Sequence, residues 1–211
     1  IALWAPALGQ SKNVLGRDDA AFARALFDKG YPELAEGLCK AILAGGSSSA
    51  ADRLAVAALE LELRQEAARS NDDPAVRRDL VSAVLADKEA FIKANSGTVE
   101  ALIVQQSMPE TYAALGTAYT DLLEQETDPT RLTELRKEGE RIFERAELEL
   151  QRRIAEIEEE LDTASESAAG KLADEDATVR FNLGKTYYYH GGTYPQGEGG
   201  YFFDKAVETF Q

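Results

Sequence analysis

The sequence predicts an all-α protein, and three observations support this. Long stretches consist mainly of Ala, Leu, Glu, Arg and Lys, the residues that lose least side-chain freedom in a helix. Only six of the 211 residues are proline, and alternating Val, Ile and Thr runs, which are typical of strands, do not occur. Hydrophobic residues make up 44% of the chain and charged residues 29%. This balance favours a folded protein over a disordered one.

The beginning of the chain differs in composition from the rest. Residues 1–9 are apolar and end in Ala7-Leu8-Gly9, small residues at the spacing that a signal peptidase prefers. They indicate the tail of an export signal and favour an exported or periplasmic location. An apolar docking segment of a cytoplasmic protein is the alternative. We separate residues 1–17 from a helical repeat domain at residues 18–211, which we expect to continue because no helix-stop signal precedes Gln211.

The first half of the repeat domain predicts four helices. From residue 18 to 44, apolar residues spaced by four on either side of Gly30-Tyr31-Pro32 predict a helical hairpin. The serine-containing loop at 45–49 is expected to cap a helix at 50–69, and Asp73 with Pro74 to start another that runs to about residue 93. The apolar positions expected to face inward are Phe22, Leu26, Leu34, Leu38, Ile42, Leu80, Val84 and Phe91.

The middle of the chain predicts an interrupted helix and then the longest one. A helix from about Thr98 to Leu122 is expected to break or kink at Pro109. The helix at 130–161 is expected to span on the order of 45 Å. Its charged coat indicates a solvated face with (i, i+4) pairs such as Glu149 with Arg153. Its apolar residues lie close to a seven-residue spacing, so a short coiled-coil arm that contacts a partner is the alternative. These apolar residues are Phe143, Leu150, Ile154, Ile157 and Leu161.

The C-terminal segment is predicted to be a connection at 162–170, a helix that begins at Asp174-Glu175-Asp176, a non-helical stretch at 191–200 and a helix from about Tyr201. Nine of the seventeen aromatic residues of the chain lie between residues 181 and 211. One hairpin cannot bury that much apolar surface against itself. We therefore expect this segment to be an interface, covered by a further hairpin of the same polypeptide or by another subunit.

Two short segments share the same spacing of Leu-Gly and Tyr. The stretch from Tyr112 to Tyr119 contains Leu115-Gly116, and Leu183-Gly184 with Tyr187 repeats the spacing. This pattern resembles the first helix of a tetratricopeptide repeat. The hairpin at 18–44 matches in its latter part, at Gly30, Tyr31 and Ala35, and departs from the family at Ala23 and Cys39. The resemblance implies antiparallel helical hairpins stacked in a right-handed superhelical array, with one extended helix that exceeds the family's usual length.

The resemblance also implies a partner-binding surface. In the family, the first helix of each hairpin lines a concave inner surface at fixed positions. On this chain those positions are Arg17, Ala20, Arg24, Phe27, Glu110, Ala113, Thr117, Thr120, Thr178, Phe181, Lys185 and Tyr188. The residues expected to bind the partner are Arg24, Phe27, Thr117, Thr120, Phe181, Lys185 and Tyr188. Arg24 and Lys185 are expected to meet a carboxylate of the partner.

Composition excludes several other classes of function. Acids outnumber bases 38 to 23, for a net charge of −15. This charge disfavours nucleic acid and anionic membranes and fits a basic partner better. No apolar run is long enough to span a bilayer. A single cysteine, Cys39, and a single histidine, His190, leave no thiolate or histidine cluster for a metal, and Gly184-Lys185-Thr186 lacks the first glycine of a phosphate-binding loop. We expect no cofactor and no metal.

The sequence therefore predicts a non-catalytic scaffold for protein–protein interaction. A structural subunit permanently buried in a large assembly is the second hypothesis. An enzyme that uses His190 and nearby acids is the third, but a lone histidine beside a loop is more typical of capping or packing.

Overall fold

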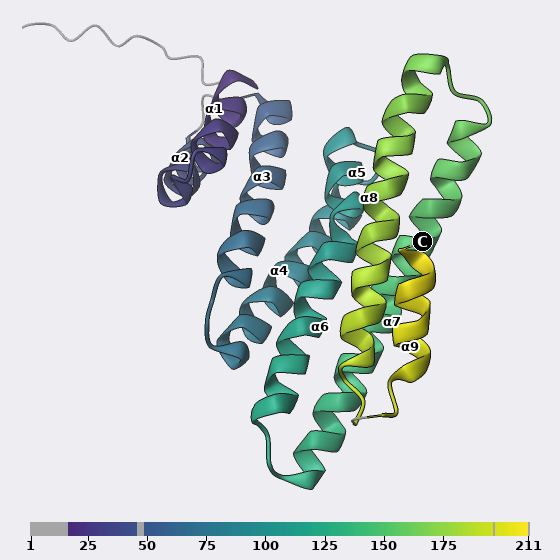
Figure 1. Cartoon of the computed structure of the whole chain (residues 1–211). Helices are drawn as coiled ribbons and strands as arrows, with labels where there is room; N and C mark the ends of the chain where they lie inside the picture. Colours follow the sequence, from purple (N-terminus) through teal and green to yellow (C-terminus); the bar gives the residue numbers. More distant parts are fainter. Residues whose placement is uncertain (1–16, 46–48, 196, 211) are drawn as a thin grey trace, which may run out of the picture. The chain divides into compact units, whose positions relative to one another are not determined.

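The structure, a computed structural model, describes residues 17–45, 49–195 and 197–210, and all regular secondary structure in these residues is helical (Figure 1). This confirms the all-α prediction. The chain divides into two compact units, one up to Leu63 and one from Arg64 onward, so the boundary falls within α3. The helices are α1 (Arg17–Asp28), α2 (Pro32–Ala44), α3 (Ala50–Arg69), α4 (Pro74–Ala94), α5 (Val99–Gln106), α6 (Met108–Gln125), α7 (Pro129–Leu161), α8 (Glu166–Gly191) and α9 (Gly200–Thr209).

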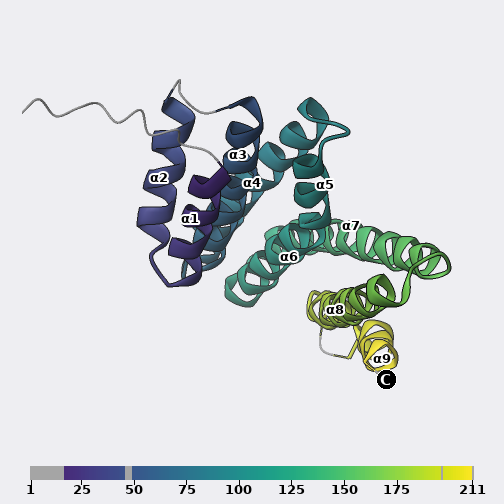
Figure 2. The ribbon, with the colours of Figure 1, turned by 90° about the horizontal axis from the view of Figure 1, so that it is seen from above.

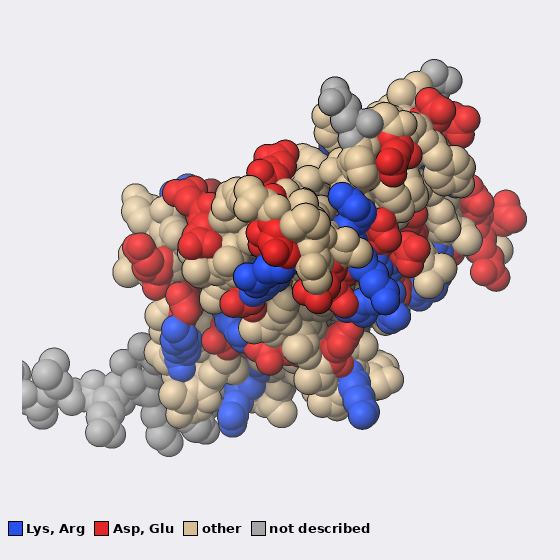
Figure 3. Space-filling view, turned by 90° about the horizontal axis from the view of Figure 1, so that it is seen from below, with Lys and Arg blue, Asp and Glu red and all other residues tan. Residues whose placement is uncertain are grey.

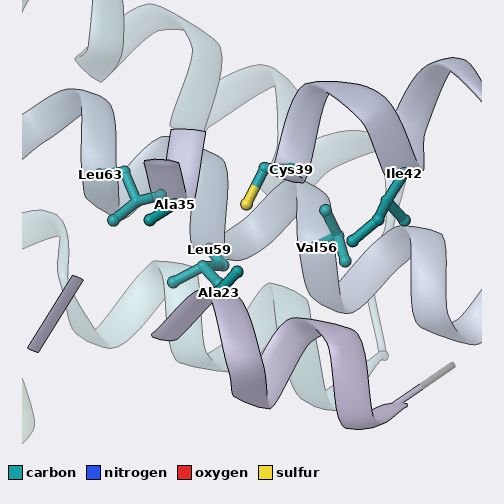
Figure 4. Close-up of a cluster of buried hydrophobic side chains, with 7 residues drawn as sticks. All are labelled: Ala23, Ala35, Cys39, Ile42, Val56, Leu59 and Leu63. Atoms are coloured by element: carbon teal, nitrogen blue, oxygen red, sulfur yellow. The ribbon is translucent and has the colours of Figure 1, made fainter. Parts of the chain in front are cut away.

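The first unit contains the predicted hairpin of α1 and α2. Gly30, with φ +82°, forms the turn between them in a conformation that favours glycine. Figure 4 shows the core of this unit, in which the Cys39 side chain lies among aliphatic groups. The core residues are Ala23, Ala35, Cys39, Ile42, Val56, Leu59 and Leu63. Phe22 and Leu34 are exposed, against the prediction, because the small neighbouring Ala23 and Ala35 face the core instead.

Caps at two helix starts agree with the sequence. The Ser49 hydroxyl accepts a hydrogen bond from the backbone N–H of Asp52 at 3.1 Å. The carboxylate of Asp73 accepts from the N–H groups of Ala75 and Val76, which satisfies donors that have no partner inside the helix. These bonds fix where α3 and α4 begin.

The inner face of α4 differs from the prediction by one residue. Leu80 is exposed, whereas Val81 and Val84 are buried. Lys88 is buried on the same stripe, and its ammonium group donates to Ser107 at 2.8 Å, to Thr111 at 2.9 Å and to Gln65. This polar network sets the orientation of α4, because a buried ammonium group must stay close to its acceptors.

The expected interruption before Pro109 is present as the junction of two helices at Ser107. Pro109 is the second residue of α6, where its missing N–H would have had no partner within the helix. α6 and α7 then form a hairpin, and α7 starts on the Asp128 cap. A core cluster joins α6 and α7 to α3 and α4, and its buried members are Ala68, Val81, Met108, Tyr112, Leu115, Ile142 and Ala146.

The apolar seam of α7 is covered by this chain itself, so the coiled-coil arm is not what the structure contains. Leu150 and Ile154 pack with Leu183 and Tyr187 of α8 in a buried cluster. Figure 2 shows α8 lying alongside α6 and α7, with α9 in the layer beyond.

The solvated face of α7 carries ion pairs, but not the expected pair of Glu149 with Arg153. Glu149 pairs instead with Arg145 and Arg152. Arg153 is turned toward α8, where its guanidinium lies 2.8 Å from the carboxylate of Glu175. Its partners therefore tie the two helices together.

α8 begins earlier than the sequence indicated. It starts at Glu166, within the expected connection, and Asp174-Glu175-Asp176 lies inside the helix rather than at its start. The alanine-rich run favours helix strongly enough to include the exposed Gly170. Residues 192–195 and 197–199 are non-helical as predicted, whereas Gly191 and Gly200, which were expected in the same stretch, belong to α8 and α9. The Arg136 side chain donates to the Thr193 carbonyl at 3.0 Å.

Within the described residues, no helix is both long and apolar enough to cross a membrane. Acidic and basic side chains are interleaved on the face shown in Figure 3. In the same part of the chain, no group of three or more His, Cys, Asp or Glu side chains is placed to hold a metal ion.

Candidate functional site

A groove of about 330 Å³ lies between α6 and α8 in the second unit. It exists because α6 presents small side chains, Ala113, Ala114 and Thr117, toward α8. Side chains of this size leave space between two helices that larger residues would fill. The residues that line it are Arg69, Arg77, Pro109, Glu110, Ala113, Ala114, Thr117, Asp121, Leu150, Asn182, Lys185, Thr186 and Tyr189.

Two arginines of the groove are engaged within the protein. Arg77 of α4 forms an ion pair with Asp121 of α6, and its guanidinium also donates to the Asn71 carbonyl at 2.9 Å. Arg69 lies 3.6 Å from the carboxylate of Glu66. These contacts fix one wall of the groove and leave little of the arginine charge for a ligand.

Other polar groups of the groove are open to a ligand. Lys185 is exposed, and its ammonium group lies 5.7 Å from the ring centroid of Phe181. Among the described residues, Lys185 and Glu110 form no ion pair and the side-chain amide of Asn182 forms no hydrogen bond. The groove therefore offers a cation, a carboxylate and an amide beside an apolar floor that includes Leu150.

The structure brings together some of the site residues that the sequence predicted. Thr117 and Lys185 line the same groove. Thr120 lies one turn beyond Thr117, with its methyl group close to Gly192 after α8. Phe181 and Tyr188 flank Lys185 on the exposed side of α8.

The remaining two predicted site residues lie in the first unit. The Arg24 guanidinium bonds to both carboxylate oxygens of Glu62, and the hydrogen bond raises the pKa of Arg24 above its usual value. Phe27 is half-buried against the core of that unit. Arg24 therefore already has an acidic partner.

Most residues of the groove were not predicted to be part of it. Asn182 and Tyr189 lie on the α8 stripe that also carries Thr186, at helical spacings of four and three. The helical spacing of this stripe can be read from the sequence, but only the structure shows that the stripe faces α6. Arg77 comes from α4, and no sequence pattern places it beside Asp121.

His190, the alternative catalytic candidate, is a packing residue in this structure. Its side chain is 1% exposed, and Nδ1 lies 2.5 Å from the Glu147 carboxylate. The ring stacks on Phe143 and lies 3.8 Å from the Phe202 ring centroid. Nε2 is buried with no hydrogen-bond partner among the described residues. A side chain so enclosed presents no surface to a substrate.

Comparison of the chain with models of protein families, with curated protein sequences and with solved structures found no match.

Proposed function

We propose that this protein is a non-catalytic scaffold of tetratricopeptide type, which binds a polypeptide partner in the groove between α6 and α8. The observation that carries the proposal is the groove itself, in which the polar groups of Glu110, Asn182 and Lys185 stand unpaired within the described residues. An extended peptide supplies an amide group at every residue and so suits such a surface.

The two C-terminal hairpins support the tetratricopeptide part of the proposal. A Cβ added to Gly116 would lie 2.5 Å from the ring of Phe143 in the second helix of its hairpin, and Gly184 stands in the same relation to Phe210. Leu115, Leu183 and Tyr187 are buried, as the pattern predicts, and Tyr119 is half-buried. Stacking of such hairpins in a right-handed superhelix is part of the proposal.

The charges indicate the chemistry of the partner. With acids outnumbering bases 38 to 23, the protein attracts a partner that is basic as a whole. Within the groove, Lys185 provides a position for one carboxylate of the bound segment. We therefore propose a partner segment with an acidic residue at the groove and basic residues around it.

Selection of peptides against the full chain tests this function. Phage-displayed random peptides are panned on the protein, and the enriched peptides are synthesised for fluorescence titration. Lys185→Glu is expected to weaken binding by at least about tenfold, because it places a carboxylate against that of the peptide. Asn182→Ala should weaken binding as well. Lys137→Glu makes an equal change of charge at an exposed position of α7 outside the groove. Its affinity for the peptide should stay within about twofold of that of the unchanged protein. Failure to enrich any peptide, or equal losses for Lys137→Glu and Lys185→Glu, would contradict the proposal.

The alternative, a subunit permanently buried in a large assembly, is favoured by one observation. Large apolar side chains of α8 and α9 are exposed, among them Phe181, Tyr188, Tyr201 and Val207. Size-exclusion chromatography separates the two functions, because a scaffold should remain dispersed alone, whereas a permanent subunit should aggregate.

A further inference from the structure

A second pocket, of about 510 Å³, lies in the second unit, where the end of α4, the junction of α5 with α6 and the middle of α7 come together. We call it the α4/α7 pocket. Its apolar lining includes Met108 and Tyr112, which are 6% and 4% exposed, and the half-buried Ile92. A volume of several hundred cubic ångströms over apolar side chains is typical of sites for small organic molecules. None of its lining residues lines the groove between α6 and α8.

One cation of the α4/α7 pocket has no acidic partner. Lys93 is exposed and follows Glu89 by four residues on α4, the spacing at which a carboxylate and an ammonium group pair on a helix. The Glu89 carboxylate instead accepts a hydrogen bond from the Tyr112 hydroxyl at 3.0 Å. Lys93 forms no ion pair with any residue that the structure describes. Its ammonium group is therefore open to a ligand.

A second cation of the pocket is only partly neutralised. The Arg145 guanidinium lies 3.7 Å from the carboxylate of Glu149, whereas Arg152 contacts the same carboxylate at 2.9 Å and also pairs with Glu156 outside the pocket. Arg145 lies over the ring of Tyr112, 5.8 Å from its centroid, and 56% of its side chain is exposed. The uncompensated positive charge of the pocket therefore belongs to Lys93 and Arg145.

From these contacts we infer that the α4/α7 pocket binds a small aromatic carboxylate. The ring of the ligand lies against Ile92 and Met108, whose thioether makes favourable contacts with aromatic rings. Its carboxylate lies between Lys93 and Arg145, and the planar guanidinium of Arg145 stacks on the ring. The side-chain amide of Gln105, which forms no hydrogen bond among the described residues, donates to the carboxylate as well. An inorganic anion is a poorer ligand, because it leaves the apolar lining in water.

The protein carries its own reporter for this pocket. The sequence contains a single methionine, Met108, which lines it. The full chain is labelled at the methionine methyl group for NMR, and Met108→Leu assigns the signal by removing it. Naphthoate is the probe, because it joins a fused aromatic ring to one carboxylate. The control ligands are naphthylmethanol, which has the ring without the charge, and inorganic phosphate, which has charge without a ring.

Naphthoate is expected to shift the Met108 methyl signal, with a Kd below about 1 mM. Lys93→Gln and Arg145→Gln should each raise this Kd by at least about fivefold, because each removes a charge that faces the carboxylate. Lys137→Gln is the matched control, since Lys137 is exposed on α7 and does not line the pocket, and it should stay within about twofold. Glu89→Gln should lower the Kd by about threefold. Such a gain in affinity does not arise from damage to the fold.

Four results would overturn the inference. Naphthoate might leave the Met108 signal unshifted, or naphthylmethanol shift it equally, which would show that the cations are not used. Equal weakening by Lys137→Gln would place the effect outside the pocket. Displacement of naphthoate by an equal concentration of inorganic phosphate would assign the pocket to inorganic anions. None of these outcomes bears on the peptide groove, because no residue varied here lines it.

Discussion

Gly116 faces the ring of Phe143 so closely that a side chain at this position would overlap it, with an added Cβ 2.5 Å from two ring carbons. Gly116→Leu should lower the free energy of unfolding by about 1 to 3 kcal/mol, because the ring must move out of a packed site. Urea denaturation monitored by circular dichroism measures the change. Gly170→Leu is the control, since a Cβ at Gly170 of α8 meets nothing within 4 Å. It should leave stability unchanged or raise it.

The buried pair of His190 and Glu147 predicts a second loss of stability. Glu147→Ala removes the partner of Nδ1 and leaves both ring nitrogens of His190 buried without one, at a cost of about 1 to 3 kcal/mol. Glu144→Ala replaces an exposed residue one turn earlier on α7 and should change the free energy of unfolding by less than about 0.5 kcal/mol. Equal losses of unfolding free energy in the two variants would show that the pair of His190 and Glu147 does not stabilise the fold.

The buried ammonium group of Lys88 predicts a larger effect. Lys88→Ala removes an aliphatic stem from the core and the donor that Ser107 and Thr111 share, so we expect a loss of about 2 to 4 kcal/mol. Lys93→Ala, at the exposed end of α4, should be nearly neutral. A thermal melt in which both variants behave like the unchanged protein would rule out a structural role for the network.

The thiol of Cys39 should be unreactive in the folded protein. Burial raises its pKa to about 11, so that little thiolate exists near neutral pH, and the side chain lies within the core of the first unit. Alkylation by iodoacetamide at pH 8, followed by mass spectrometry, should be slow in buffer and fast in concentrated urea. Rapid labelling of the folded protein would mean that this core opens readily.

The raised pKa also predicts a dependence of stability on pH. A group that is neutral when protonated and has a higher pKa in the folded state stabilises folding below its unfolded pKa, and this contribution is lost as the pH rises. For Cys39 the window runs from its ordinary pKa of 9.0 to about 11. Burial also raises the pKa of Tyr112, from 10.0 to about 12. This group therefore lowers the stability further as the pH rises from 10 to about 12. The free energy of unfolding should therefore fall from pH 9 upward, less steeply in Cys39→Ala, as measured by urea titrations at successive pH values.

The sequence predicted most helix ends correctly because they depend on neighbouring residues. Asp73-Pro74 and Asp128-Pro129 each supply a cap and a proline whose effects are local, and both helices begin there. Burial was predicted less well. Leu80 and Phe22 lie one residue from the buried face, because the choice between neighbours depends on which helix packs against them.

The groove was predictable only in part, for the same reason. Thr117 and Lys185 follow from the repeat pattern, since each stands next to the glycine of its own hairpin. Arg77 and Asp121 are brought together by the packing of α4 on α6, which no local spacing encodes. The start of α8 was predicted too late, at the acidic run that begins with Asp174. The alanine-rich segment before this run forms helix without it, so the acidic residues do not mark the start.

The two walls of the groove belong to different hairpins, α6 to one and α8 to the next. Its width is therefore set by the packing of α8 on α7, where Leu150 and Ile154 meet Leu183 and Tyr187. A substitution in this buried contact, at residues that lie outside α6, is therefore expected to change the distance between the two walls.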